Sequence, residues 1–150
     1  ESTPKTSSSP EAARIIGERW RGDADVRRCR EGGRVLRSAD VPYEHAGLAL
    51  MGRAVWPEDP SAGVPEKLPG VLVVHTAVGL QEDFLSWKLD AIASQGYLAF
   101  GVDMFGAGRA LWSREDNMAA RRPLQEDRAL MAERMLCAYE ALRGMEGCDV

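Results

Sequence analysis

The sequence has few cysteines and no long apolar segment. Its 150 residues include three cysteines, and no two of them form a Cys-x-x-Cys pair. This pattern excludes a disulfide scaffold and a four-cysteine zinc site, and it favours a reducing compartment, which we expect to be the cytoplasm. Apolar runs such as Val71–Val74 are far shorter than the roughly 20 residues of a membrane-spanning helix, so we expect no membrane partner.

The chain also lacks an excess of positive charge. It has 19 Lys and Arg residues against 23 Asp and Glu residues, a net charge of −4. We therefore expect no nucleic-acid partner. The two histidines, His45 and His75, are far apart in sequence and have no cysteine or carboxylate pattern beside them, so no metal site is predicted. His45 falls in a turn and is expected to be solvated.

The beginning of the chain differs in composition from the rest. Residues 1–10 contain no large apolar side chain and are expected to be disordered. Ala12–Trp20 is a short helix candidate, and a polar segment follows it. We expect residues 1–33 to be a disordered or weakly helical extension, and residues 34–150 to form one folded unit.

Residues 34–102 predict a β-hairpin and then a βαβ unit. The hairpin joins Arg34–Glu44 to Leu48–Trp56 through an Ala46-Gly47 turn, and a proline-rich loop covers 57–70. Val71–Val74 is a continuous aliphatic run, typical of a parallel strand that is covered on both faces. A helix from about residue 82 to Gly96 and a strand at Tyr97–Val102 complete the unit.

The rest of the chain predicts one long helix. A glycine-containing loop and a polar stretch reach Arg122, and Pro123 fits the first turn of a helix. Leu124 and Leu142 mark the ends of its apolar face, and another strand is expected to begin at Cys148. The predicted fold is α/β, a mostly parallel sheet flanked by helices with an N-terminal β-hairpin.

The order and spacing of these elements resemble the dienelactone hydrolase family of α/β-hydrolases. The pieces that carry the resemblance are Pro69–His75, Gly79-Leu80, Ser94–Tyr97, Val102–Gly106 and Leu124–Arg128. The resemblance implies hydrolysis of carboxylic esters or lactones through an acyl-enzyme. It also implies a small-molecule substrate, a Cys or Ser nucleophile with Asp and His, and no cofactor.

The nucleophile motif of that family is missing from the sequence. No Ser or Cys has a glycine two positions before it and another two positions after it, as the strand-to-helix elbow requires. The chain therefore resembles the N-terminal half of such a hydrolase, with the triad expected beyond Val150. Residues 1–150 alone are predicted to be inactive. The alternative is a non-catalytic α/β remnant that binds a protein partner through its open sheet edge.

The resemblance assigns one functional element to this half, the loop that follows the first parallel strand. In the family this loop donates a backbone N–H to the oxyanion hole. By position the donor is the amide of Ala77, with Val78 as the next choice. Thr76 stands where well-studied members carry a glutamate that tunes the nucleophile.

Other candidate residues have a structural interpretation that we weigh against a functional one. His75 ends a buried strand, but no nucleophile elbow is present to pair with it, so hydrogen bonding to nearby loops is favoured. Asp103 follows a strand, where ligands of α/β folds gather, but the resemblance favours a structural acceptor for loop amides. We expect both side chains, together with Thr76, to lie beside the pocket. Trp56, Trp87 and Trp112 are expected to pack rather than to stack on a ligand.

A nucleotide-binding module is the third hypothesis. Gly106-Ala107-Gly108 is a fragment of Gly-x-Gly-x-x-Gly, but Leu111 stands at the third glycine position. Asp103 and Phe105 also stand between the strand and the first glycine, where a dinucleotide loop turns at once.

The position of Val71–Val74 in the sheet predicts how the chain associates. Val71–Val74 is expected to lie between Tyr97–Val102 and a strand that follows Val150. If that strand is absent, the exposed edge predicts self-association.

Overall fold

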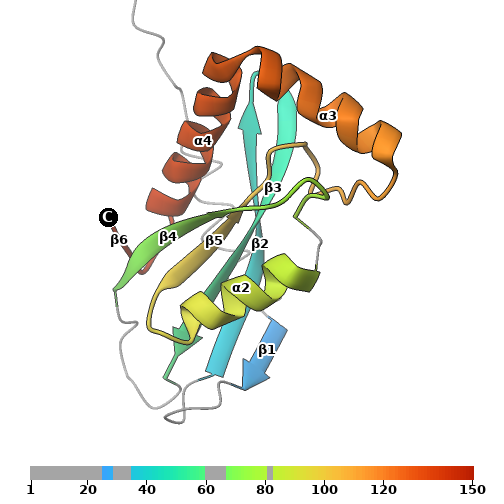
Figure 1. Cartoon of the computed structure of the whole chain (residues 1–150). Helices are drawn as coiled ribbons and strands as arrows, with labels where there is room; N and C mark the ends of the chain where they lie inside the picture. Colours follow the sequence, from blue (N-terminus) through green and yellow to red (C-terminus); the bar gives the residue numbers. More distant parts are fainter. Residues whose placement is uncertain (1–24, 29–34, 60–66, 81–82) are drawn as a thin grey trace, which may run out of the picture.

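The computed structural model describes residues 25–28, 35–59, 67–80 and 83–150. These residues form a six-stranded sheet in the order β1-β2-β3-β5-β4-β6, with helices α2 and α4 on opposite faces (Figure 1). The predicted α/β architecture is confirmed, but the sheet is mixed rather than mostly parallel, because three of its five strand pairings in the described residues are antiparallel. The elements in chain order are β1 (Asp25–Arg28), β2 (Val35–His45), β3 (Leu48–Glu58), β4 (Leu68–Val74), α2 (Asp83–Ala93), β5 (Leu98–Val102), α3 (Arg114–Glu126), α4 (Arg128–Arg143) and β6 (Cys148–Asp149).

The predicted hairpin is present as β2 and β3. Ala46 and Gly47 both adopt positive φ angles, 48° and 80°, as a two-residue hairpin turn with the twist of its strands requires. The antiparallel register runs from Val35 opposite Glu58 to His45 opposite Leu48. The second strand extends past the predicted end at Trp56 into the proline-rich segment, so the loop is shorter than expected.

The βαβ unit is confirmed as β4-α2-β5. Strands β4 and β5 are parallel, with Leu72 opposite Phe100, and β3 pairs antiparallel with the far side of β5. Strand β4 begins at Leu68 rather than at Val71. The sequence favours a loop at Leu68 because Pro69 and Gly70 follow it. In the structure, the Leu68 amide donates to the Gly147 carbonyl at 2.8 Å, and this bond holds the start of the strand.

Two clusters of apolar side chains hold helices against the two faces of the sheet. Leu98, Phe100 and Val102 of β5 belong to the cluster that includes Leu142 of α4. Ala99, which points to the opposite face, belongs to the cluster that includes Leu85, Leu89 and Ala93 of α2. All five residues of β5 are buried, so β5 rather than β4 is the central strand of this sheet.

Strand β4 is covered on both faces, as predicted, but less completely. Leu72 packs against the α4 cluster, while Val71 and Val73 belong to the α2 cluster. Val74 is nevertheless 47% exposed. The outer partner of β4 is short, because β6 pairs only with Leu68 and Pro69. In the described structure no strand therefore lies beside Val74 on that side. The strand predicted to begin at Cys148 is thus present.

The prediction of one long helix over Leu124–Leu142 is wrong, because the structure has two helices. The polar stretch before Arg122 forms α3, whose N-terminus is capped by Ser113 through a 3.0 Å bond from the Asp116 amide. Pro123 lies inside α3 near its end, not in a first turn. Asp127 then caps a new helix, α4. Only Leu124 of α3 is buried, so its sequence carries almost no apolar signal.

The predicted N-terminal extension lies mostly outside the described residues, including the helix candidate Ala12–Trp20. Its described part, β1, is a strand that pairs antiparallel with β2, so the expectation of disordered or helical structure is wrong there. Within the described ranges, no helix combines the length and the apolar character that crossing a bilayer requires.

Candidate functional site

The candidate site lies where β4 and β5 end. Because the two strands are parallel, the loop 75–80 after β4 and the loop 103–112 after β5 emerge at the same edge of the sheet (Figure 1). A bridge between Gly79 and Ala110 joins the two loops, and the Leu111 amide donates to the Val78 carbonyl at 2.7 Å. Gly79 has a φ of +110°, and a Cβ there would lie 2.4 Å from the Arg109 carbonyl oxygen. The close approach of the loops therefore requires glycine.

His75 connects the same two loops through both ring nitrogens. Its Nε2 accepts a hydrogen bond from the Met104 amide at 3.1 Å. Nδ1 lies 2.6 Å from the Thr76 carbonyl oxygen and therefore carries the proton that it donates. The ring also packs on Phe105, with centroids 4.6 Å apart. This geometry agrees with the structural interpretation of His75, since loop backbone uses both nitrogens.

Asp103 is the acceptor around which the second loop folds. Its side chain is 1% exposed and accepts four backbone amides at 2.8–3.0 Å, those of Met51, Phe105, Gly106 and Gly108. An ionised carboxylate accepts such bonds strongly, which offsets the cost of burying its charge. These bonds agree with the expected role as a structural acceptor for loop amides.

The glycine-containing loop leaves little for a phosphate to bind. Gly106 and Gly108 give their amides to Asp103, and the Ala107 amide donates to the Ala49 carbonyl at 2.9 Å. Phosphate-binding loops need such amides free. The nucleotide-binding hypothesis therefore receives no support from this loop.

Tyr43 of β2 supports the site and was missed by the sequence analysis. Its hydroxyl donates to the Asp103 carbonyl at 3.1 Å and accepts from the Asp103 amide at 3.0 Å. Burial raises the pKa of this hydroxyl above its ordinary value. A tyrosine in an alternating strand is typical core material, so only the three-dimensional contact identifies this role.

The backbone at Ala77 is held in place by a side chain of α3. The Ala77 carbonyl accepts a hydrogen bond from the Asn117 side-chain amide of α3, which fixes the peptide plane that also carries the Val78 N–H. The amides of Ala77 and Val78 donate to no acceptor among the residues the structure describes. Of these two residues, Ala77 also lines the cavity described next, whereas Val78 does not.

An open cavity of about 560 Å³ lies against this loop. Among the described residues, its lining comes from the end of β4, the loops after β4 and β5, α3 and α4, and includes no carboxylate. Arg121 and Arg128 contribute its positive charge. Sequence reasoning named neither arginine as a site residue, and it placed Arg121 in a polar stretch rather than in a helix. The lining residues are Val74, His75, Thr76, Ala77, Met104, Phe105, Arg121, Leu124, Gln125, Arg128 and Met131.

Other polar candidates lie away from this cavity. His45 is not solvated as expected, because its side chain is only 12% exposed and Nε2 lies 3.1 Å from Glu133 of α4. Cys137 and Cys148 are free, and burial raises the pKa of both thiols. In the part of the chain that the structure describes, no group of three His, Cys, Asp or Glu residues could hold a metal ion.

The tryptophans only partly follow the prediction that they pack. Trp56 is 8% exposed and belongs to the core. Trp87 and Trp112, by contrast, are 65% and 73% exposed. Trp87 stacks on Phe84 of the same helix, with centroids 6.0 Å apart. The prediction is therefore confirmed for Trp56 but not for the other two.

Comparisons with known proteins agree with this geometry. Residues 52–148 match the sequence profile described as the Dienelactone hydrolase family. A solved structure named m3DLH is 26% identical, with a TM-score of 0.68, and the match covers 79% of this chain and 47% of that one. No curated protein matches the chain.

Two further solved structures share the fold. A dienelactone hydrolase-like promiscuous phosphotriesterase from metagenomic libraries is 24% identical, with a TM-score of 0.66, and the match covers 76% of this chain and 45% of that one. A cold-adapted esterase from an Arctic intertidal metagenomic library is 13% identical, with a TM-score of 0.54 and coverage of 85% and 51%. The chain therefore spans about half the length of the structures it matches.

Proposed function

Because the chain belongs to the dienelactone hydrolase family, we propose that residues 34–150 are the N-terminal half of an enzyme that hydrolyses carboxylic esters or lactones. The observation that carries this proposal is the loop after β4. The amides of Ala77 and Val78 in this loop donate to no acceptor in the described structure, and Ala77 lines a cavity whereas Val78 does not. The nucleophile, the Asp and the His belong to the other half in this proposal.

The proposed role of the loop is to stabilise developing negative charge. When a nucleophile attacks the ester carbonyl, the oxygen becomes an oxyanion, and backbone N–H groups that are already aimed at it lower the barrier. The Ala77 amide is the first donor and the Val78 amide the next choice. Asn117, which binds the Ala77 carbonyl, and His75, which ties the loop to Met104, hold the donors still. Thr76 lacks the carboxylate that tunes the nucleophile in family members, so tuning by this residue is not proposed.

The positive charge of the cavity favours a particular class of substrate. Arg121 and Arg128 line it together with apolar side chains such as Phe105 and Met131. A guanidinium beside an apolar wall favours a substrate that carries an anionic group at one end. We therefore propose an ester or lactone with a carboxylate as the substrate class.

The proposal is tested with p-nitrophenyl acetate on two proteins. Residues 1–150 should hydrolyse it no faster than buffer does, because backbone donors without a nucleophile form no acyl intermediate. The protein extended past Val150 should turn it over. In the extended protein, Ala77→Pro removes the N–H and should lower kcat by about 10²–10³-fold. Ala77→Gly keeps the amide and is the matched control. Full activity in both variants would remove the oxyanion role.

A second candidate function rests on a different observation. Only two residues of β4 are paired on its outer side, and Gly70–Val74 have no strand beside them there in the described structure. A chain that keeps only this half could bind a protein partner by adding a strand at that edge. This non-catalytic role predicts association without turnover.

A further inference from the structure

The carbonyl that His75 binds belongs to the same peptide group as the Ala77 N–H. His75 Nδ1 donates to the Thr76 carbonyl oxygen at 2.6 Å, and the next atom of the backbone is the amide nitrogen of Ala77. A peptide group is planar and trans, so its N–H points in the direction opposite to its carbonyl. The hydrogen bond from His75 therefore fixes the direction of the Ala77 N–H. Both His75 and Ala77 line the cavity of about 560 Å³.

A second peptide group lies on the other side of the imidazole ring. The Met104 amide donates to His75 Nε2 at 3.1 Å. The carbonyl of that peptide group, on Asp103, accepts from the Tyr43 hydroxyl at 3.1 Å. Because Nε2 accepts a bond, the proton of the neutral ring is on Nδ1. The bonds therefore run in one direction, from the Tyr43 hydroxyl through the imidazole to the peptide group that carries the Ala77 N–H.

Hydrogen bonds that run in one direction strengthen one another. A carbonyl that accepts a bond is polarised, and the polarisation makes the N–H of the same peptide group a stronger donor. The imidazole passes this effect from one peptide group to the next, because it accepts at Nε2 and donates at Nδ1. The last donor of the series is the Ala77 N–H. It donates to no acceptor among the described residues, so an oxyanion in the cavity can bind there.

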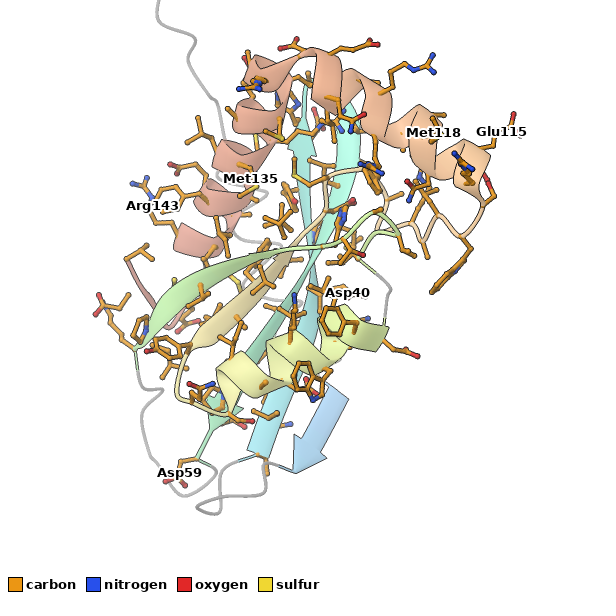
Figure 2. The ribbon with its side chains drawn as sticks, viewed as in Figure 1. Asp40, Asp59, Glu115, Met118, Met135 and Arg143 are labelled. Carbon is orange, nitrogen blue, oxygen red and sulfur yellow. The ribbon has the colours of Figure 1, made fainter. Side chains whose placement is uncertain are left out.

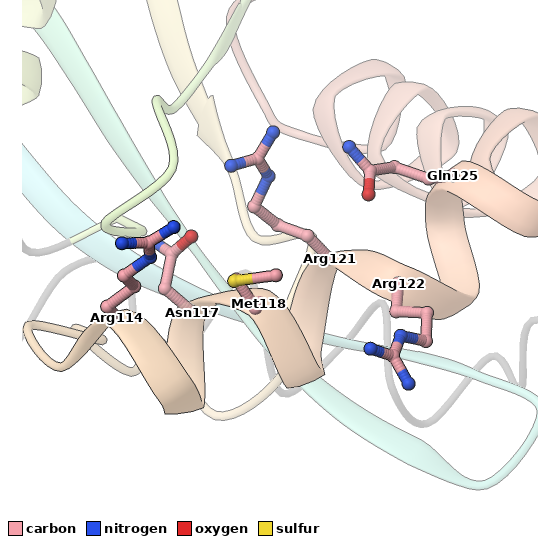
Figure 3. A pocket seen from close by; sticks show the side chains of 6 residues that line it. All are labelled: Arg114, Asn117, Met118, Arg121, Arg122 and Gln125. Atoms are coloured by element: carbon pink, nitrogen blue, oxygen red, sulfur yellow. The ribbon is translucent and has the colours of Figure 1, made fainter.

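The Val78 N–H is held in a different way. The carbonyl of its peptide group, on Ala77, accepts from the Asn117 side-chain amide. Helix α3, which carries Asn117, buries only Leu124, and its part around Met118 extends away from the sheet (Figure 2). Figure 3 shows Asn117 on the side of α3 that faces the loop after β4. Val78 is not among the described residues that line the cavity, so the Ala77 N–H is the better placed donor.

We propose that His75 is a positioning residue for the hydrolysis of esters or lactones, because it orients and strengthens the Ala77 N–H of the oxyanion hole. It acts through the Thr76 carbonyl and takes no proton from the substrate. The neutral ring with its proton on Nδ1 is the form that makes both bonds. This role rests on the proposed hydrolase function, since it requires a carbonyl oxygen that becomes negatively charged in the cavity.

Two substitutions separate the two bonds of His75. In His75→Asn, the side-chain nitrogen is attached to Cγ as Nδ1 is, so it can still donate to the Thr76 carbonyl. The shorter side chain has no atom at the place of Nε2, and the bond from the Met104 amide is lost. In His75→Gln, the side-chain oxygen can replace Nε2 as the acceptor for Met104, but the donor to the Thr76 carbonyl is lost.

The test measures p-nitrophenyl acetate hydrolysis by the protein extended past Val150. We expect His75→Gln to lower kcat by about tenfold, less than the loss of a whole oxyanion donor, and His75→Asn to lower it by about threefold or less. KM should change little in either variant, because the oxyanion exists only in the transition state and the intermediate that follows it. The control is His45→Gln, which removes an imidazole that contacts Glu133 instead and should leave kcat unchanged.

A purely structural role of His75 predicts a different order. The bond to Met104 joins two loops, whereas the bond to Thr76 lies within one. Urea denaturation should therefore show a larger loss of stability in His75→Asn than in His75→Gln, the reverse of the order in kcat. Nitrogen NMR of residues 1–150 measures the tautomer without turnover, and Nδ1 of His75 should carry the proton.

The outcomes distinguish a failure of this role from a failure of the proposed function. No turnover by the unsubstituted extended protein would overturn the hydrolase function and this role with it. Turnover by that protein, with kcat in His75→Gln equal to or above kcat in His75→Asn, would overturn the role of His75 alone. A proton on Nε2 rather than on Nδ1 would do the same, because the Met104 amide would then have no acceptor on the ring.

Discussion

At the residue scale, the loops around the cavity depend on buried polar groups that are fully used. Asp103 accepts four amides from two separate segments, the β3 strand and the loop after β5. Tyr43 then fixes the backbone of Asp103 through both its amide and its carbonyl. Buried networks of this kind specify one arrangement, because any alternative leaves polar groups without partners.

Asp103→Asn should destabilise the fold strongly. The asparagine keeps one acceptor oxygen but turns an NH₂ group toward amides that are themselves donors, leaving buried groups unsatisfied. We expect a loss of about 2–4 kcal/mol in the free energy of unfolding, measured by urea denaturation. Asp40→Asn is the control, because that carboxylate is exposed and its ion pair in the described structure is with Arg53, so its loss should cost less than about 1 kcal/mol. Equal effects of the two variants would contradict the network.

Because of Tyr43, we expect the free energy of unfolding to fall at alkaline pH. Burial raises the pKa of its hydroxyl in the folded state, whereas an unfolded tyrosine ionises near pH 10. Above about pH 10 the unfolded chain therefore binds fewer protons than the folded chain, and stability falls as pH rises. Below that pH both states keep the proton, and this group adds no slope. Urea denaturation across this range should show the decline, and Tyr43→Phe should flatten it. An unchanged slope in the variant would assign the decline to other groups.

At the element scale, the sequence signals differ in strength from one element to the next. The β2-β3 hairpin and the β4-α2-β5 unit could be predicted because alternation, aliphatic runs and a glycine stop each reflect burial or turn geometry directly. Helix α3 could not, because it buries only Leu124 and its sequence therefore has the polar character of a loop. Its local signals were the capping residue Ser113 and the acidic residues Glu115 and Asp116 of the first turn. Arg121 was missed as a site residue for the same reason.

The residues of the candidate site likewise differ in how much of their role the sequence indicates. The loop that holds Ala77 and Val78 could be named because its position in the chain order of the resemblance is enough to place it, and Ala77 lines the cavity whereas Val78 does not. Tyr43 and Asn117 could not be named, because each acts through a contact with a residue at least 40 positions away. The sequence predicts a solvated His45, and it misses the contact with Glu133 because that partner lies 88 positions further along the chain.

Asp127 lies between α3 and α4, and we expect its side chain to stabilise the start of α4. Its Oδ1 accepts the amides of Ala129 and Leu130 at 2.9 and 3.1 Å, which caps α4 and directs it onto the sheet. Asp127→Ala should lower the free energy of unfolding by about 1 kcal/mol, while Asp127→Asn keeps an acceptor and should cost far less. Glu126→Ala, next to it, removes a charge without removing a cap. Thermal denaturation distinguishes the three variants, and an equal effect of Glu126→Ala and Asp127→Ala would contradict capping.

At the scale of the whole molecule, the outer side of β4 is mostly unpaired in the described structure. Strand β5 has partners on both sides, whereas β4 has only a two-residue partner, β6, on its outer side. Its exposed edge belongs to an aliphatic strand, the kind of edge that pairs with other chains. The structures that this chain resembles are about twice as long, and a continuation of β6 would cover this edge.

Residues 1–150 by themselves should therefore associate through β4 in a concentration-dependent manner. Val74, at the exposed end of the strand, is the position at which a lysine would oppose pairing, because a charge there must be desolvated when a second strand approaches. Light scattering after size exclusion should show association of the original chain and a shift toward monomer for Val74→Lys. Leu136→Lys, on α4 and 62% exposed, removes an exposed apolar side chain elsewhere and should leave the association unchanged. If both lysine variants shift equally toward monomer, the association is a nonspecific contact between apolar side chains and does not involve the β4 edge. If the original chain is a monomer that unfolds cooperatively, the edge is not an interface.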